Sequence, residues 1–422
     1  MKIHPLLILL IFVVFSISAP VALAAKSPVP EPFQRFDENS KFTILYDDLT
    51  NLFKAVVVDV GMSTREKAAP AQAATGTRMK STVKRSTINE ANRFYYETFA
   101  NNEEAQNLLI GIQESLEQVP GDAPLEYFSR DEQLAYWLNL YNVTVLNQII
   151  KEYPKRNLKK LVTGKDSIFS KKILNVAGVP LSLDDIEYTI LKTNYNSDPL
   201  IIYGLYQGYI GGPNIRKRAY TGNDVWRALK NNANEFINSN RGTYPKDEKT
   251  FRVSSLYERN KAFFPDFDDD LTKHLLTYIE GEERSELRAA MSIRADIDDW
   301  TVTDLGGTYR DLGASFADNN AALLNAVVAT TPSDDSSAAA AITGNAQPMA
   351  AAVGYGSAAI AQKAQPLSRF STEMLIQLKE INLKRQNTNA ENARVTMEEL
   401  GEATDASKPV PENKDKEDKE DN

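Results

Sequence analysis

The stretch from Arg130 to Tyr153 constrains the fold more than any other, because it predicts a helix that is apolar on nearly all sides. Ser129 is a candidate N-cap, and Glu132 three residues later completes the pattern of a capping box. Pro154 marks the end of the helix. Because a helix without a polar face is stable only when it is buried, we expect this one at the centre of the fold.

Shorter elements are expected around this central helix. Apolar residues at spacings of three and four predict a helix over residues 88–127, and residues 173–181 read as a hairpin. The apolar run 200–205 is predicted to be a strand. Together these elements indicate an α+β fold, with a single mainly helical domain and a small sheet over residues 33–318.

The beginning of the chain predicts export. Residues 1–24 combine an early positive charge, an unbroken apolar run of ten residues and the small residues that signal peptidase requires. The run is much shorter than the roughly 20 residues that span a bilayer, which favours a cleaved signal peptide over an anchor. We therefore expect a short linker over residues 25–32, no transmembrane segment in the mature chain, and a periplasmic or alternatively secreted protein.

The composition changes after the predicted domain. Residues 319–367 are a low-complexity linker rich in Ala and Ser, and residues 368–400 contain a possible isolated helix. Residues 401–422 are rich in charge and lack aromatic side chains, which is typical of a disordered acidic tail. The sequence thus predicts a disordered C-terminal extension.

The residue types that the chain lacks exclude several kinds of chemistry. It contains no cysteine and two histidines, of which His4 lies in the predicted signal peptide and His274 in the domain. A thiol nucleophile, a disulfide framework, a thiolate zinc site and a three-histidine metal site are therefore excluded. The formal net charge of -9 argues against general nucleic-acid binding. We expect neither a metal nor another cofactor.

Four segments resemble one protein family. Residues 129–142, SRDEQLAYWLNLYN, resemble the signature helix of the exported bacterial family known as domain of unknown function 547. Residues 179–187 are similar to its "sLxdIE" segment, Asp198-Pro199 to the start of its apolar strand, and residues 218–222 to its "rxaYtg" turn. The resemblance covers roughly residues 40–310. It implies a fold, but no particular reaction.

The resemblance also implies what this chain does not do. Many members of the family carry cysteines in the loop after the Asp-Pro segment, at positions that align approximately with Gln207 and Gly212. Their histidines align with Tyr188 and Ile202. Since every residue of a thiolate–imidazole pair is replaced, this chain is expected not to use that mechanism.

Two asparagines on the central helix are the first candidates for a site. Asn139 and Asn142 lie three residues apart on one face, and with Tyr141 and Gln207 they form a candidate polar cluster. Buried amides need hydrogen-bond partners. Either they line a ligand pocket, or they bind the backbone of a neighbouring loop, which is the commoner arrangement.

A group of carboxylates is the second candidate. A carboxylate-dependent hydrolase of cell-wall glycan or peptide would use Asp185 and Glu187 as acid and base, with the amide of Asn142 as a third candidate. The alternative interpretation is that these acidic residues stabilise the first turn of a helix.

Basic residues form the third candidate, a docking surface. Its cations are predicted to attract an anionic envelope component or an acidic protein partner, although they equally suit a solvated basic face. The residues are Lys155, Arg156, Lys159, Lys160, Arg216, Lys217 and Arg218. The sequence as a whole favours a non-catalytic binding or scaffolding role in the periplasm or cell envelope, with the hydrolase as the alternative.

Overall fold

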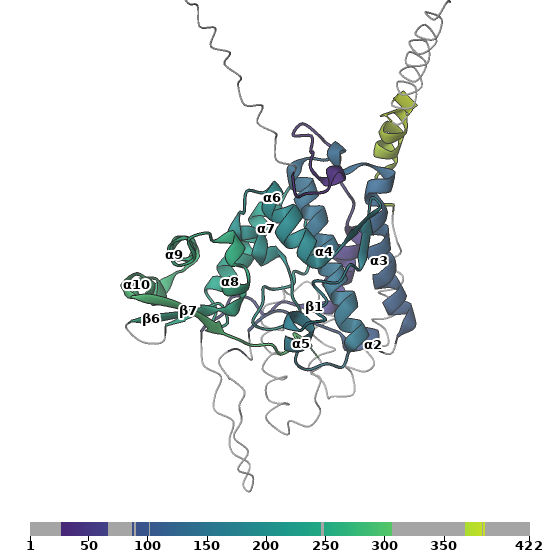
Figure 1. The fold of residues 1–422 in the computed structure, drawn as a ribbon. Helices are drawn as coiled ribbons and strands as arrows, with labels where there is room; N and C mark the ends of the chain where they lie inside the picture. Colours follow the sequence, from purple (N-terminus) through teal and green to yellow (C-terminus); the bar gives the residue numbers. More distant parts are fainter. Residues whose placement is uncertain are drawn as a thin grey trace, which may run out of the picture.

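The computed structural model describes residues 27–65, 87, 90–100, 102–245, 249–305, 368–381 and 383–384. The predicted signal peptide, the low-complexity linker and the acidic tail lie outside these residues. The described part is mainly helical with small sheets, as predicted (Figure 1).

The helices are α1 (Asp47–Val56), α2 (Glu97–Ala100), α3 (Glu103–Asp122), α4 (Arg130–Glu152), α5 (Lys159–Thr163), α6 (Lys192–Asn194), α7 (Val225–Ile237), α8 (Ser255–Arg259), α9 (Phe267–Tyr278) and α10 (Gly281–Ala289). Short 3-10 helices are η1 (Glu31–Phe33), η2 (Leu125–Tyr127), η4 (Pro199–Gly204) and η5 (Lys261–Phe263), and η3 (Asp185–Leu191) is a π-helix.

Three small sheets accompany the helices in the described residues. Two are antiparallel pairs, β1 (Val57–Val58) with β2 (Arg93–Phe94) and β3 (Leu174–Val176) with β4 (Val179–Leu181). The third joins β5 (Thr243–Pro245), β6 (Thr250–Ser254) and β7 (Ser292–Ile297), with β5 antiparallel and β7 parallel to β6.

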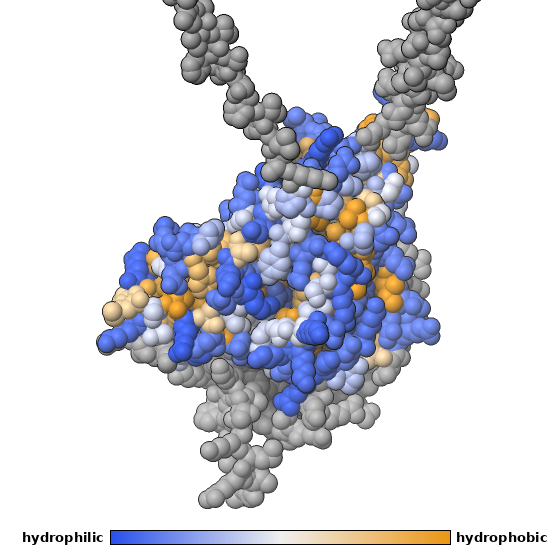
Figure 2. All heavy atoms as spheres, viewed as in Figure 1, coloured by the Kyte–Doolittle hydropathy of each residue, from blue (hydrophilic) through white to orange (hydrophobic). Residues whose placement is uncertain are grey.

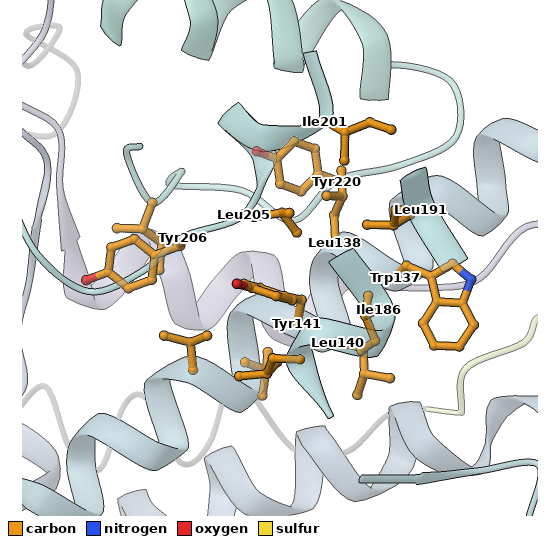
Figure 3. Packing of buried hydrophobic residues seen from close by; sticks show 14 of the residues in the cluster. Trp137, Leu138, Leu140, Tyr141, Ile186, Leu191, Ile201, Leu205, Tyr206 and Tyr220 are labelled. Atoms are coloured by element: carbon orange, nitrogen blue, oxygen red, sulfur yellow. The ribbon is translucent and has the colours of Figure 1, made fainter. Parts of the chain in front are cut away.

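The central position of α4 is confirmed. Its residues Trp137, Leu138 and Leu140 are fully buried. They meet apolar side chains of η3 and η4, among them Ile186 and Ile201, while α3 and α7 also pack against α4 (Figure 3). The prediction from the sequence is correct here because the helix has no polar face that could be exposed to water.

The N-terminus of α4 is capped as predicted, but its acidic partner has another role. The Ser129 hydroxyl accepts a hydrogen bond from the Glu132 amide at 3.2 Å. The Glu132 carboxylate does not return to Ser129. It accepts from the amides of Ile44 at 2.9 Å and Gly222 at 3.1 Å, and so fixes two distant segments to the start of the helix.

Two predicted elements are wrong. Residues 88–127 do not form one helix: they contain β2, α2 and α3, and the Asn102 side chain starts α3 by accepting from the Ala105 amide. Residues 200–205 are not a strand, because the Asp198 side chain caps a 3-10 helix that begins at Pro199. A buried apolar run has the same composition in either conformation, so the periodicity does not separate them.

The helix expected within residues 368–400 begins at residue 372, and it is not isolated. Phe370, Met374 and Leu378 are buried against the domain. The sequence does not reveal this contact because the matching surface comes from segments far away in the chain.

One face of the molecule is mostly polar (Figure 2). On the face shown in Figure 2 hydrophilic residues dominate, and hydrophobic residues appear in small separate patches. Within the described residues, no helix combines the length and apolarity that crossing a membrane requires.

Candidate functional site

Asn139 and Asn142 each clamp a loop to the central helix. Asn139 donates to the Tyr220 carbonyl at 2.8 Å and accepts from the Tyr220 amide at 2.9 Å. Asn142 donates to the Gly204 carbonyl at 3.0 Å and accepts from the Tyr206 amide at 2.8 Å. Both side chains are buried and their hydrogen bonds go to backbone atoms. This is the structural arrangement, rather than the lining of a pocket.

We predict that Asn142→Ala lowers the free energy of unfolding by about 2–3 kcal/mol, because it leaves a buried carbonyl and a buried amide without their partner. Urea denaturation measures this loss. Asn175→Ala, on the exposed hairpin, is the matched control and should stay within about 0.5 kcal/mol. Equal stability of the two variants would contradict the clamp.

Glu187 is buried on η3, beneath the same central helix. It is 2% exposed, and its Oε2 accepts a hydrogen bond from the Tyr141 hydroxyl at 3.3 Å. Burial raises the pKa of Glu187 to about 7, with a further increase from Asp184 and an opposing effect from Arg259. At neutral pH this carboxyl group is therefore partly protonated.

Gln207 lies in a polar group with Tyr209 and Arg259, both of which interact electrostatically with Glu187. Its amide oxygen accepts from the Tyr209 hydroxyl at 2.7 Å and from Arg259 Nη1 at 2.8 Å. Arg259 also donates to the Tyr209 hydroxyl, and its guanidinium lies 5.3 Å from the centre of the Trp300 ring. We refer to Tyr141, Glu187, Gln207, Tyr209, Arg259 and Trp300 as the Glu187–Arg259 cluster.

Three buried polar atoms of the Glu187–Arg259 cluster have no hydrogen-bond partner among the described residues: Glu187 Oε1, Arg259 Nε and Trp300 Nε1. Glu187 and Arg259 influence each other electrostatically, but in the described part of the chain they do not approach within the 4.0 Å of an ion pair. Arg259 itself is half-buried, so the cluster reaches the surface there.

The structure does not pair Asp185 with Glu187. Asp185 Oδ2 accepts from the Ser182 amide at 2.6 Å and contacts the Lys172 ammonium. Although partial burial alone raises it, the hydrogen bonds and charge of these partners leave the pKa of Asp185 lowered overall. Asp184, by contrast, has a pKa raised by partial burial and by Asp185. Because Ser182 Oγ accepts in turn from the Asp185 amide at 3.1 Å, Ser182 and Asp185 cap the first turn of this helix reciprocally.

The basic residues divide into two groups. Lys155 pairs with Glu152 at 2.8 Å just beyond the end of α4, and exposed Lys159 lies 5.9 Å from the Trp300 ring centre. Arg216 pairs with Asp224 at 3.4 Å and stacks over Tyr220, the residue bound to Asn139.

Along α4, Glu152 lies about 20 Å from Asn139, because an α-helix rises by about 1.5 Å per residue. A docking surface that joins the two basic groups would therefore have to span that length. The predicted docking role of Lys160, Lys217 and Arg218 stays a prediction.

No cluster of three or more potential metal ligands occurs among the described residues. His274 stacks on Tyr203 and its Nε2 lies 2.9 Å from the Tyr203 hydroxyl. Burial lowers the pKa of His274 to about 4. The histidine is thus a neutral part of an aromatic core.

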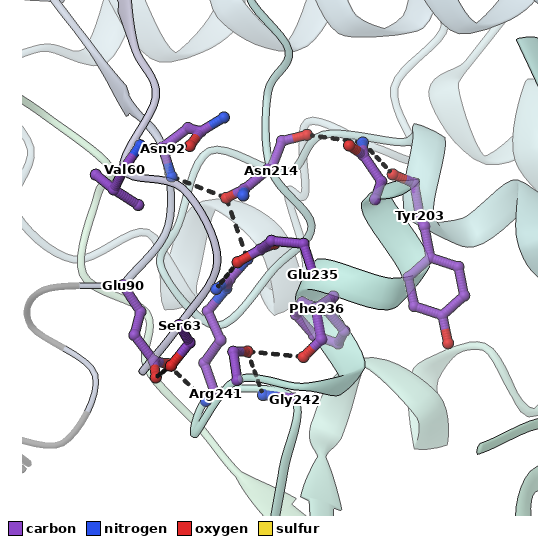
Figure 4. A network of polar contacts seen from close by, with 12 residues as sticks. Val60, Ser63, Glu90, Asn92, Tyr203, Asn214, Glu235, Phe236, Arg241 and Gly242 are labelled. Carbon is purple, nitrogen blue, oxygen red and sulfur yellow. Dashed lines mark hydrogen bonds and ion pairs between the residues drawn. The ribbon is translucent and has the colours of Figure 1, made fainter. Parts of the chain in front are cut away.

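A second polar centre was not predicted from the sequence (Figure 4). Fully buried Arg241 donates to both oxygens of Glu235, at 2.8 and 2.5 Å, and to Asn214 Oδ1 at 3.1 Å. The Arg241 backbone amide donates to Glu90 Oε2 at 2.9 Å. All its strong contacts are internal, which makes it a stabilising network rather than a ligand site.

Sequence reasoning also missed Tyr209, Arg259 and Trp300. They lie in three separate segments, and no motif or regular spacing joins them. The sequence predicts that Gln207 and Tyr141 form a cluster with the two asparagines. In the structure, Tyr141 instead donates to Glu187, and Gln207 accepts from Arg259.

These observations define a mainly helical α+β domain, organised by one buried helix and carrying an internal polar cluster. Residues 125–237 match the model of a family described as "Protein of unknown function, DUF547". This match confirms the resemblance for the central part of the domain. No curated protein and no solved structure matches the chain.

Proposed function

We propose that this chain is an exported, non-catalytic binding protein of the periplasm or cell envelope, and that the Glu187–Arg259 cluster binds its ligand. The three unpartnered buried atoms of the cluster carry the proposal. Each buried polar group without a hydrogen bond costs about 1–3 kcal/mol. A ligand that supplies the missing partners recovers part of this free energy.

The unpartnered atoms suggest the class of ligand. Glu187 Oε1 is an acceptor when ionised, whereas Arg259 Nε and Trp300 Nε1 donate. A peptide amide meets both needs, with its N–H directed to the carboxylate and its carbonyl to the donors. Cell-wall peptide is a source of such amides in the compartment that residues 1–24 predict.

The hydrolase remains the second candidate, since a pKa of about 7 suits Glu187 for proton transfer. Two observations count against it. Glycoside hydrolysis needs two carboxyl groups flanking one bond, whereas Asp185 is engaged by Ser182 and Lys172. The position that aligns with a family cysteine holds Gln207, whose amide is not a nucleophile.

Titration calorimetry with soluble muropeptides tests the proposal. The wild-type chain should bind them, and Arg259→Met should weaken binding at least about tenfold by removing one donor (1.4 kcal/mol per tenfold). Arg252→Met is the matched control, because Arg252 is a partly buried arginine whose guanidinium binds Asp296 instead of the cluster residues. Its affinity should equal that of the wild type.

The ligand recovered after the titration is then analysed by chromatography. Intact muropeptide supports binding without reaction. Cleavage of the muropeptide that requires Glu187 would favour the hydrolase. If Arg259→Met bound the muropeptide as tightly as the wild type does, the proposed site would be wrong.

A further inference from the structure

Residues 368–378 are distant in the sequence from the N-terminal part of the domain but pack against it. The helix that they lead into stands near the C-terminal end of α3 (yellow-green in Figure 1). Phe370, Met374 and Leu378, spaced by four residues, form one buried face of this segment. Residues 306–367 separate it from the rest of the described domain.

Arg369 is the main polar contact of the segment. Its guanidinium donates to Asp48 Oδ1 at 2.8 Å and Oδ2 at 2.7 Å, to the Leu45 carbonyl at 2.9 Å and to Ser115 Oγ at 2.7 Å. The side chains of Arg369 and Asp48 are 4% and 1% exposed. This is a bidentate, charge-assisted pair removed from water.

Backbone and aromatic contacts complete the site. The Leu45 amide donates to the Arg369 carbonyl at 2.8 Å. The ring of Phe370 stacks on Phe128, with centroids 6.0 Å apart and planes 22° apart. The site therefore recognises an arginine, the backbone beside it and the aromatic residue that follows.

The receptor side of this contact belongs entirely to the domain. Asp48 lies in the first turn of α1, Ser115 is on α3, and Phe128 precedes α4. Among the described residues Arg369 is the cation paired with Asp48. Without an arginine the site would hold a buried carboxylate lacking its counter-charge, which costs several kcal/mol. The domain is thus built to receive a guanidinium.

The docked helix contacts the domain through one face only. Leu375, Ile376 and Leu383 of the same helix are exposed. Because the contact consists of one helical face, Arg369, Phe370 and one backbone hydrogen bond to Leu45, we expect that the segment can leave without unfolding the elements beneath it.

We propose that Asp48, Leu45, Ser115 and Phe128 form a recognition site for an arginine–aromatic segment, and that the same segment of a second copy of this chain binds there when the chain's own segment is displaced. Exchange of an identical element between copies is an inexpensive route to association. The partner that fits has Arg, an aromatic residue at the next position, and apolar residues four and eight positions after that.

A labelled peptide of residues 366–384 tests the proposal by fluorescence polarisation. In the full chain, Arg369→Ala combined with Phe370→Ala empties the site, and this variant should bind the peptide at least ten times more tightly than the wild type. A peptide in which Ala replaces Arg369 should bind the variant at least ten times more weakly. Glu380→Ala, at an exposed position of the docked helix, is the matched control and should behave as the wild type.

A second measurement does not depend on the folding of that variant. A protease site is inserted after residue 340 of the otherwise unchanged chain, and the cleaved protein is incubated with excess unlabelled peptide. Displacement of the C-terminal fragment in gel filtration supports exchange. A fragment that resists displacement, or a folded double variant that does not bind the peptide, would overturn the proposal.

Discussion

Replacing Arg241 by methionine is expected to lower the free energy of unfolding by about 3–5 kcal/mol, the cost of leaving one member of a buried ion pair alone. Glu235 would lose both of its hydrogen bonds to the guanidinium. Burial raises the pKa of Glu235, and Arg241 opposes part of this increase. Without the arginine, this carboxyl group should take up a proton. Urea denaturation at pH 7 measures the loss.

The double variant Arg241→Met, Glu235→Leu separates charge from packing. Removing both members of a buried pair is often close to neutral, so this variant should recover most of the lost stability. Arg252→Met breaks a more exposed pair and should cost less than about 1 kcal/mol. A loss in Arg241→Met no larger than in Arg252→Met would show that the network contributes little.

Glu187→Gln is expected to change how stability depends on pH. The pKa of Glu187 is about 7 in the folded chain against an ordinary value of 4.5, so the folded state binds its proton more tightly. Its contribution to stability is fully present below pH 4.5 and is lost as the pH rises through 7. The window corresponds to about 3 kcal/mol. Relative to the wild type, Glu187→Gln should therefore become more stable between pH 4.5 and 7.5.

The titration of His274 changes the stability in the opposite direction over nearly the same pH range. Its folded pKa of about 4 lies below the ordinary 6.5, so its contribution is present above pH 6.5 and is lost as the pH falls through 4. The two contributions oppose each other in the wild type. Glu187→Gln should expose the acid sensitivity that His274 causes.

His274→Phe, which keeps an aromatic ring against Tyr203 and Phe264, is the companion variant. It should lose stability as the pH rises from 4.5 to 7.5, because Glu187 is then unopposed. Urea denaturation at several pH values gives both difference profiles, in which the other titrating groups cancel. Parallel profiles of the two variants would contradict the pKa shifts.

The sequence predicts the centre of this fold well, because α4 carries its own signals: an apolar surface, a cap at Ser129 and a proline after its end. The run 200–205 has no periodic pattern of its own. Its conformation is set by the Asp198 side chain, which caps the 3-10 helix. For the site, the sequence identified residues that share one helix or loop. Arg259 and Arg369 could not be found, because each acquires its role from residues brought near only by folding.

The asparagine clamps have a consequence for how this architecture can vary. In the loops of residues 204, 206 and 220, Asn139 and Asn142 bind main-chain atoms, so these hydrogen bonds hold the path of the loops and do not depend on the side chains there. A substitution in those loops leaves the clamps intact provided that the backbone keeps its path. The scaffold can therefore exchange one set of site residues for another, for example at Gln207, while its shape is preserved.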